Sequence, residues 1–466
     1  MANAIGELDR IEVTLERGER IILPSDIEKH GFVNSSAMFF NPISRIDLKT
    51  GIPPFHGLEE QVVTRNPQWI GQPIGLILAQ SRQRALELAH TAVIRMTSVK
   101  RPVVCLKEAI EKELFHQPLV KQIETGDIEM LQKDKSLIVI ESEVHTNAQF
   151  HGYTEPLSAV CDYKNGKFDL AVTTQFPSCL HETVAFALQV PQNQISVSVK
   201  RIGGGFGGKG TKSTLPAVAV AMAARIVKQR VCLEIPLRDS LQMVGIRPEN
   251  LYRYKSYFDK SGQCQGLDFT QYGDSGITDN DGKFFSGPVI IAMSGIVQGP
   301  WNIKNVRYSS ACVKTNKPPS TFMRAPGILC SAYFMEHVFN TAARELKLDP
   351  LHIRTINLID NGFVDMWGRT EVGDRVRFNF EQVKREVNLP NQLAMIKHFN
   401  QNNIYKKQGW SMTPFKYRWT NDIVIGGIKI LIGRFDGSVW VANFGVEMGQ
   451  GQHTRIAQVI AGAYHL

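Results

Sequence analysis

The chain has 466 residues, of which 43% are hydrophobic and 21% are charged, and its formal net charge is +9. This length predicts roughly two to four domains, and the composition is that of a soluble globular protein rather than a disordered or fibrous one. Its apolar runs are too short for a membrane helix, its first residues do not form a signal peptide, and it has no Lys/Arg block with interleaved aromatics. We therefore expect neither a membrane nor a nucleic acid among its partners.

The seven cysteines are scattered, and no two of them form a C-x-x-C pair. This spacing argues against a disulfide framework, a structural zinc site and a cysteine-ligated iron–sulfur cluster. We expect free thiols in a reducing compartment, and hence a cytoplasmic protein.

The first third of the chain predicts a small α/β unit that follows a segment without a clear period. Residues 1–50 stay unassigned, although alternation over 10–24 suggests a hairpin. Residues 69–80 predict an apolar strand, and 81–96 predict an amphipathic helix. A polar stretch over 121–136 is interpreted as a connector between two domains.

From residue 136 onward, predicted strands and helices alternate. The predicted strands cover residues 136–145, 168–175, 194–202, 230–237, 426–435 and 438–448, and 250–320 is rich in β-structure. The predicted helices cover residues 178–190, 213–227, 331–348, 351–359 and 454–466. The last helix is apolar and has no C-cap, so we expect an interrupted domain at this end.

The stretch "KRIGGGFGGKG", residues 200–210, lies between a predicted strand and a predicted helix. Gly203, Gly205 and Gly208 satisfy G-x-G-x-x-G, whose glycines let backbone N–H groups approach a phosphate closely. The acidic partner of a dinucleotide loop is expected about 20 residues on, but Glu234 lies inside a predicted strand. A dinucleotide loop, a structural turn and another cofactor cradle all stay open on these residues alone. Phe206, in the middle of the glycines, suggests a rigid wall beside a bound group.

Three further loops share this character. Gln175 ends a predicted strand, Arg324 lies in the apolar loop "STFMRAPG", and Gln450 lies between two glycines at the start of a helix. Each loop offers neutral or cationic donors and little acid. Together they could satisfy a large anionic ligand with many acceptor atoms.

These stretches resemble, in order, the molybdopterin-binding region of the xanthine dehydrogenase and aldehyde oxidase family. The segments that carry the resemblance are residues 173–175, 200–209, 312–327, 348–359 and 447–454. The resemblance extends from about residue 53 to 466. It implies a pyranopterin cofactor that carries molybdenum, with no metal bound directly by a protein side chain. It also implies a homodimer, together with [2Fe–2S] clusters and FAD whose domains this chain does not show.

The fold class implied by the resemblance is α+β. We expect a partial α/β hammerhead domain over 51–115, followed by mixed α/β molybdopterin-binding domains. The first of these covers 130–370, and the second begins at 395 and is cut short at 466.

The resemblance also assigns roles to residues at the metal end of the cofactor. Gln175 would hydrogen-bond an oxo ligand of the metal. Phe206 and Gly207 would contact the metal end through backbone N–H groups, and Gly205 in the same loop would also bind the cofactor. Arg324 would line the same site. From the residues alone, Gln175 could also be a strand-end amide and Arg324 a surface ion-pair residue.

Gly449 and Gln450 would hold the pterin or its phosphate by the same resemblance. Glu155, in the stretch "QFHGYTEP", is interpreted as structural support.

The residues expected around the substrate differ from those of purine-oxidising relatives. Such relatives carry Glu where this chain has Gly210, and Phe where it has Pro326. They carry Phe-Thr where it has Trp419 and Thr420, and an arginine near the position of Ala292. Loss of the glutamate and of the arginine removes charge-assisted hydrogen bonds to a purine. We therefore expect the substrate to be a small-molecule aldehyde or aromatic heterocycle rather than xanthine.

No catalytic residue is assigned. The general-base Glu of the family is expected beyond residue 466, so we expect the chain to be inactive alone. Two other interpretations stay open. One is an NAD(P)-dependent dehydrogenase that uses the glycine loop, and the other is a non-enzymatic remnant without a cofactor.

Overall fold

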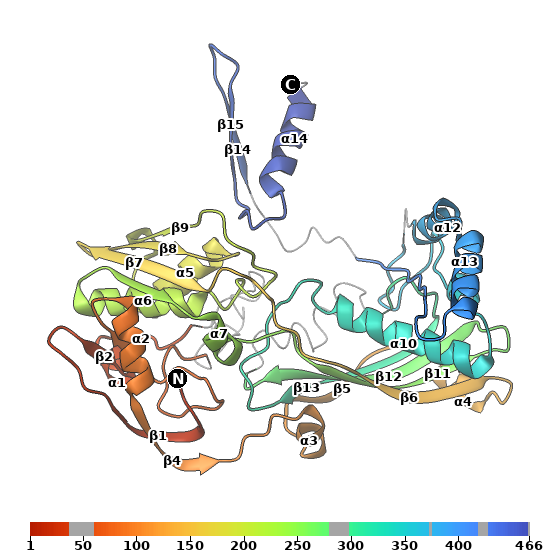
Figure 1. Cartoon of the computed structure of the whole chain (residues 1–466), viewed down its shortest axis with the longest axis horizontal. Coiled ribbons are helices and arrows are strands. Elements are labelled where there is room, and N and C mark those ends of the chain that lie inside the picture. The colour runs from red at the N-terminus through yellow and green to blue at the C-terminus, as the bar shows by residue number, and fades with distance from the viewer. Residues whose placement is uncertain (37–59, 279–297, 372–374, 418–426, 465–466) are drawn as a thin grey trace.

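The computed structural model describes residues 1–36, 60–278, 298–371, 375–417 and 427–464 (Figure 1). Helices and sheets are both present among the described residues, which confirms the predicted mixed fold class. The domain boundaries stay a prediction. Every helix among the described residues is too short or too polar to cross a membrane.

The N-terminal unit is built from strand pairs that join distant segments. Strand β1 (Ile5–Glu12) pairs antiparallel with β4 (Val93–Lys100), and β2 (Arg20–Ile22) pairs with β3 (Leu76–Leu78). The predicted hairpin over 10–24 is therefore wrong, because each of its strands pairs with a strand from much later in the chain. The first residues thus belong with the unit predicted to start at residue 51.

Helix α2 (Arg82–Thr91) is shorter than predicted. Ala92 takes an extended conformation, and the β-branched residues that follow enter β4 instead of continuing the helix. Short helices α1 (Pro24–Lys29) and α3 (Leu106–Glu111) complete this region.

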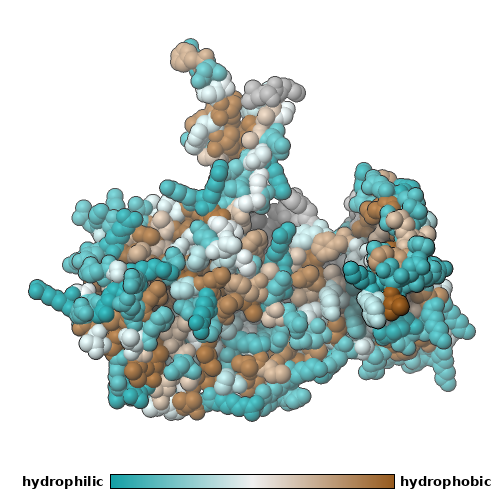
Figure 2. Space-filling view, in the orientation of Figure 1, coloured by the Kyte–Doolittle hydropathy of each residue, from teal (hydrophilic) through white to brown (hydrophobic). Residues whose placement is uncertain are grey.

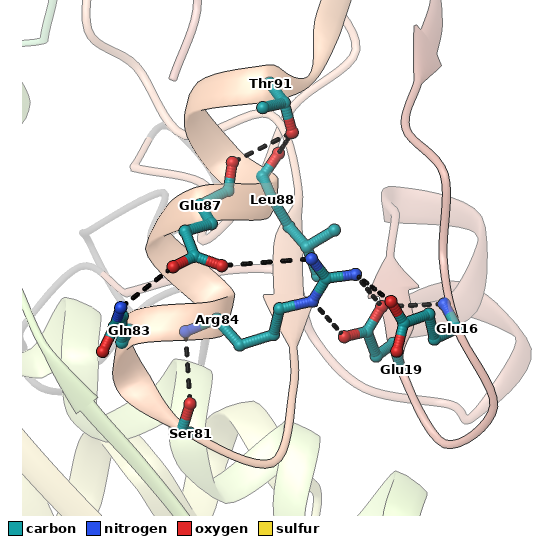
Figure 3. Close-up of polar contacts among 8 residues, drawn as sticks. All are labelled: Glu16, Glu19, Ser81, Gln83, Arg84, Glu87, Leu88 and Thr91. Carbon is teal, nitrogen blue, oxygen red and sulfur yellow. Dashed lines mark hydrogen bonds and ion pairs between the residues drawn. The ribbon is translucent and has the colours of Figure 1, made fainter.

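A polar cluster ties α2 to the turn before β2, as Figure 3 shows. Ser81 accepts a hydrogen bond from the backbone N–H of Arg84 and caps the helix. The Arg84 guanidinium lies 2.6 Å from a carboxylate oxygen of Glu19 and 3.0 Å from one of Glu16. The hydrogen bond from Arg84 lowers the pKa of Glu19. Such partly exposed pairs add little stability but fix the relative position of two elements.

The first lobe is a four-stranded sheet in the order β10-β7-β8-β9, with two helices packed on it. Its strands are β7 (Ser158–Lys164), β8 (Lys167–Val172), β9 (Ile195–Ser198) and β10 (Val231–Glu234). The helices α5 (Pro177–Leu188) and α6 (Thr214–Val227) bury their apolar faces against these strands. Helix α6 is buried over nearly all of its length, because its small alanine side chains allow close packing. The 3-10 helix η1 (Gln192–Gln194) and α7 (Leu237–Met243) flank this lobe.

The second lobe is a five-stranded sheet in the order β5-β13-β12-β11-β6. Its strands are β5 (Phe115–Thr125), β6 (Ile138–Thr146), β11 (Asn250–Phe258), β12 (Cys264–Gly276) and β13 (Asn305–Lys314). The polar stretch over 121–136 is not the predicted connector. Strand β5 pairs with β13, and α4 (Ile128–Lys133) packs Leu131 into a small apolar cluster beside the sheet.

The long helix α10 (Ile328–Leu346) covers one face of this sheet (Figure 1). Three further helices follow it along the chain: α11 (Pro350–Ile356), α12 (Val376–Glu386) and α13 (Leu389–Asn402).

In the last described segment, a hairpin and a helix stand apart from both lobes (Figure 1). Strands β14 (Ile428–Ile432) and β15 (Val439–Asn443) form an antiparallel hairpin beside helix α14 (Gln452–Tyr464). Both elements project from the top of the molecule in Figure 1, and Figure 2 shows hydrophobic side chains gathered on them. Several large apolar residues here are more than half exposed, including Trp440 and Val459, whereas Ile460 is buried.

Phe334 on α10 is the centre of the second core. Its ring lies 4.5 Å from that of Tyr252 and 5.1 Å from that of Phe269. We expect Phe334→Ala to lower the free energy of unfolding by about 3–5 kcal/mol, because it removes buried surface and leaves a cavity. Tyr333→Ala, at the exposed neighbouring position, should change it by about 0.5 kcal/mol or less. Urea denaturation of both variants measures this, and equal losses would contradict the packing described here.

Candidate functional site

The glycine loop connects β9 to α6 and meets the end of β8. The backbone N–H of Gly207 donates to the side-chain oxygen of Gln175 at 2.9 Å. The backbone N–H of Gln175 in turn donates to the carbonyl of Lys209 at 2.8 Å. Gln175, three residues after the end of β8, is thus held by the loop at two points.

Two glycines of the loop are required by close approach. A Cβ at Gly205 would lie 2.6 Å from the Gln175 side chain, and one at Gly207 would lie 2.4 Å from the carbonyl oxygen of Phe322. Gly207 also has a φ of +98°, which other residues rarely adopt. Phe206 has a φ of +51° and is 38% exposed, so its ring is held on the surface of the loop.

The Arg324 loop joins the same place from the second lobe. The backbone N–H of Arg324 donates to the carbonyl of Phe206 at 2.7 Å. The structure therefore brings Gln175, Phe206 and Arg324 together from three segments that are far apart in the sequence. The Arg324 guanidinium is exposed and makes neither a hydrogen bond nor an ion pair with the residues described.

A buried ion pair lies beneath the glycine loop. Lys209 is fully buried, and its Nζ lies 2.6 Å from a carboxylate oxygen of Glu155. The same oxygen accepts the backbone N–H of Gly203 at 2.7 Å, and Lys209 also lies over the ring of Tyr153. Burial lowers the pKa of Lys209, although the hydrogen bond to Glu155 acts in the opposite direction. Glu155 thus holds both ends of the loop, which agrees with the supporting role expected for it.

The buried His151 side chain forms a hydrogen bond with the Arg324 loop. Its Nε2 lies 2.6 Å from the carbonyl oxygen of Phe322, so this nitrogen carries the proton. Nδ1 is buried and has no hydrogen-bond partner among the residues that the structure describes. Burial lowers the pKa of His151 from 6.5 to about 4, so the ring is neutral near pH 7.

Gly449 and Gln450 lie in a turn that Glu447 organises. One Glu447 carboxylate oxygen accepts the N–H groups of Gly449 and Gly451, both at 3.0 Å. These backbone hydrogen bonds and the one from His453 lower the pKa of Glu447. The Gln450 amide is engaged within its own turn, since it donates to the carbonyl of Val446. The turn reaches the glycine loop through the carbonyl of Glu447, which accepts the N–H of Ile202 at 3.0 Å.

The expected substrate residues are only partly described. Gly210 is buried, and a Cβ there would lie 2.9 Å from the carbonyl of Gly207 and 3.3 Å from the ring of Phe176. Pro326 is half-buried in the Arg324 loop. Trp419 and Thr420, like Ala292, lie outside the residues that the structure describes.

The arrangement of strands does not suit a dinucleotide loop. Strands β9 and β10, which flank the glycine loop and α6, lie at opposite edges of the four-stranded sheet. A dinucleotide fold instead joins neighbouring parallel strands through this loop. The helix also begins at Thr214, well after the last glycine of the motif.

The donors at this junction fit an anionic group. Within the described part of the chain, the Gln175 amide nitrogen and the Phe206 backbone N–H donate to no other residue, and the Arg324 guanidinium is free. The Gly207 N–H is already engaged by the Gln175 side chain, as are the Gly449 N–H by Glu447 and the Gln450 amide by Val446. Neutral and cationic donors on closely approaching backbone are the chemistry that a phosphorylated, oxygen-rich cofactor needs.

Sequence reasoning missed three buried residues behind these loops: His151, Lys209 as an ion-pair partner, and Arg247. His151 lies in the stretch quoted for Glu155, so position in a motif could have indicated it. Arg247 has no local sequence signal.

Comparison with known proteins gives two matching family models. One, described as a molybdopterin cofactor-binding domain, matches residues 110–358, and a second with the same description matches residues 382–465. A xanthine dehydrogenase/oxidase from Gallus gallus is 31% identical over 404 residues, which is 86% of this chain and 29% of that protein. Aldehyde oxidase 1 from Cavia porcellus is 27% identical over 84% of this chain and 29% of its own length. The chain thus spans about three tenths of the length of these relatives.

Solved structures show the same fold. Quinoline 2-oxidoreductase from Pseudomonas putida 86 superposes with a TM-score of 0.76 at 17% identity, covering 99% of this chain and 60% of that one. CO dehydrogenase from Oligotropha carboxidovorans superposes with a TM-score of 0.77 at 16% identity, again covering 99% of this chain and 60% of the other.

The low pKa of His151 predicts a pH dependence of stability. Because its pKa is about 4 in the folded state and 6.5 when unfolded, only the unfolded chain binds the proton between these values. Stability that is present above pH 6.5 should be lost as the pH falls toward 4. From pH 7 to pH 4.5 the loss attributable to this residue should be about 2–3 kcal/mol.

His151→Gln keeps a donor for the Phe322 carbonyl but cannot titrate, so its denaturation curves should depend less on pH over this range. Parallel pH profiles for the two proteins would rule out a buried neutral His151.

Proposed function

Since the chain belongs to the xanthine dehydrogenase and aldehyde oxidase family of molybdopterin-binding oxidoreductases, we propose that it holds the metal end of a molybdenum cofactor where its three loops meet. The observation that carries this proposal is the junction of Gln175, Phe206 and Arg324 through backbone hydrogen bonds. When bound, such a cofactor supplies a two-electron oxidation of carbon that takes its oxygen from water.

Each residue of the junction has a role that follows from its geometry. The Gln175 amide nitrogen is free to donate a hydrogen bond to the bound group, while its oxygen already holds Gly207. The free backbone N–H of Phe206 lies beside it on a loop whose shape is fixed. Arg324 adds a positive charge that no described residue neutralises and that attracts an anion. Gly449 and Gln450, on the turn tied to Ile202, would support the rest of the cofactor.

For the substrate we propose an aldehyde or an aromatic heterocycle rather than a purine. Xanthine dehydrogenases and aldehyde oxidases resemble this chain about equally, so family similarity does not decide between them. Gly210 supports the proposal. It offers no carboxylate, and its surroundings leave no space for a side chain unless Gly207 or Phe176 shifts. A site without polar anchors leaves the hydrogen-bonding groups of a bound purine unpaired, and burying them unpaired costs binding free energy.

The complete reaction also needs an exit for two electrons. Relatives in this family carry [2Fe–2S] clusters and FAD in domains outside the region matched here. We infer that turnover requires such domains, whereas cofactor binding by this chain does not.

Cofactor loading tests the proposal directly. The chain is expressed in a host that makes molybdopterin, then molybdenum is measured by mass spectrometry and pterin by its fluorescence after oxidation. We expect close to one of each per chain for the natural protein. Gly207→Ala should load at least tenfold less, because its Cβ presses on the Phe322 carbonyl. Gly409→Ala is the control, since a Cβ there meets no atom within 4 Å.

Natural protein that emerges from this host without molybdenum or pterin would refute the proposal. Binding of NAD that is lost in Gly205→Val, measured by calorimetry, would favour the dehydrogenase interpretation. On loaded protein under anaerobic conditions, an aromatic aldehyde should bind at least tenfold more tightly than xanthine does, as followed by absorbance. The reverse order would refute the substrate proposal alone.

A further inference from the structure

We propose that Arg247 is a positioning residue for the cofactor site, which locks the Arg324 loop in place and adds an uncompensated positive charge behind it. This inference rests on the proposed function.

The Arg247 side chain is almost completely buried, with 4% of its surface exposed. Its guanidinium donates to the carbonyl oxygens of two consecutive residues, Arg324 and Ala325, the latter at 3.1 Å. Its Nε donates to the side-chain oxygen of Gln149 at 3.1 Å. One planar guanidinium therefore grips both carbonyls that flank the turn of the loop.

The loop needs such a grip because of its conformation. Ala325 has a φ of +57°, a left-handed value that is unfavourable for a residue with a Cβ. The same turn carries the Arg324 N–H that binds the Phe206 carbonyl. Relaxation of Ala325 would reorient the preceding peptide and break this contact between the two loops.

The anchor of Arg247 is itself rigid. Its backbone N–H and carbonyl pair with those of Gln149 in a β-bridge, at 2.9 and 3.4 Å. The carbonyl of its neighbour Ile246 accepts the N–H of Thr321, which begins the loop, at 3.1 Å. Arg247 is therefore anchored by the β-bridge with Gln149, and its side chain holds the Arg324 loop in a fixed position relative to this bridge.

The charge of Arg247 has no counterpart among the described residues. Its hydrogen-bond acceptors are neutral, and no described carboxylate lies within ion-pair distance. The buried Lys209 and Lys212 are neutralised by Glu155 and Glu60, so Arg247 and the free Arg324 leave the junction positive. Burial lowers the pKa of Arg247, and its charge contributes to the low pKa of His151, so the field reaches the neighbouring side chain. Removal of this charge would weaken the attraction for an anionic cofactor.

Three variants separate positioning, charge and simple destabilisation. Arg247→Met removes both the grip and the charge, and Arg247→Lys keeps the charge but cannot span two carbonyls. Arg354→Met is the matched control. Arg354 is equally buried, but it forms an ion pair with Glu336 in the second lobe, away from the glycine loop.

The measurements are molybdenum and pterin per folded chain after expression in a molybdopterin-producing host, with folding monitored by circular dichroism. We expect at least a tenfold loss of cofactor for Arg247→Met and at least a threefold loss for Arg247→Lys. Arg354→Met should lower the melting temperature but leave the cofactor content per folded chain unchanged. Full loading of Arg247→Met, full loading of Arg247→Lys, or an equal loss in Arg354→Met would each overturn the proposal.

A second readout does not need the cofactor. Hydrogen exchange of cofactor-free protein should be at least tenfold faster in Arg247→Lys than in the natural protein for the peptide covering 321–327. Unchanged exchange there would overturn the positioning role, even if Arg247→Met does not fold. Natural protein that binds no cofactor would instead refute the proposed function, and the exchange measurement would still decide the role of Arg247.

Discussion

The candidate site depends on backbone hydrogen bonds between loops rather than on contacts between side chains. The N–H of Arg324 reaches the carbonyl of Phe206, and the N–H of Gly207 reaches Gln175. These contacts join a loop of the second lobe to the glycine loop and the strand end of the first. Since backbone groups must come this close, glycine at 207 is a geometric requirement. The side chains that would meet a ligand are then left free to do so.

Local periodicity correctly predicted elements whose apolar pattern is visible within the element itself. Helix α6 and strand β6 follow such patterns and were correctly placed. Strand β5 was misread as a connector because its polar residues form an edge strand whose partner, β13, lies far along the chain. The N-terminal strands failed for the same reason, since pairing with β4 and β3 is not visible from alternation alone.

The site divides in the same way. The chemical type of each loop was visible in the sequence, and the resemblance to a family named their residues. The sequence did not reveal the buried residues that hold these loops, such as His151 and Arg247. Arg247 is separated by 77 residues from the carbonyl of Arg324 that it holds, and nothing near it in the sequence marks it. A residue whose partners are main-chain oxygens leaves no complementary charge by which to recognise the pair.

The β14–β15 hairpin has a consequence for handling the purified chain. Two strands alone are marginally stable, and the outer edge of each, within the described segment, offers unpaired main-chain groups beside half-exposed Leu431 and Trp440. Such a ribbon is a template on which any extended peptide can add a strand. Self-association that grows with concentration and is suppressed by charged residues on the ribbon would follow from this geometry.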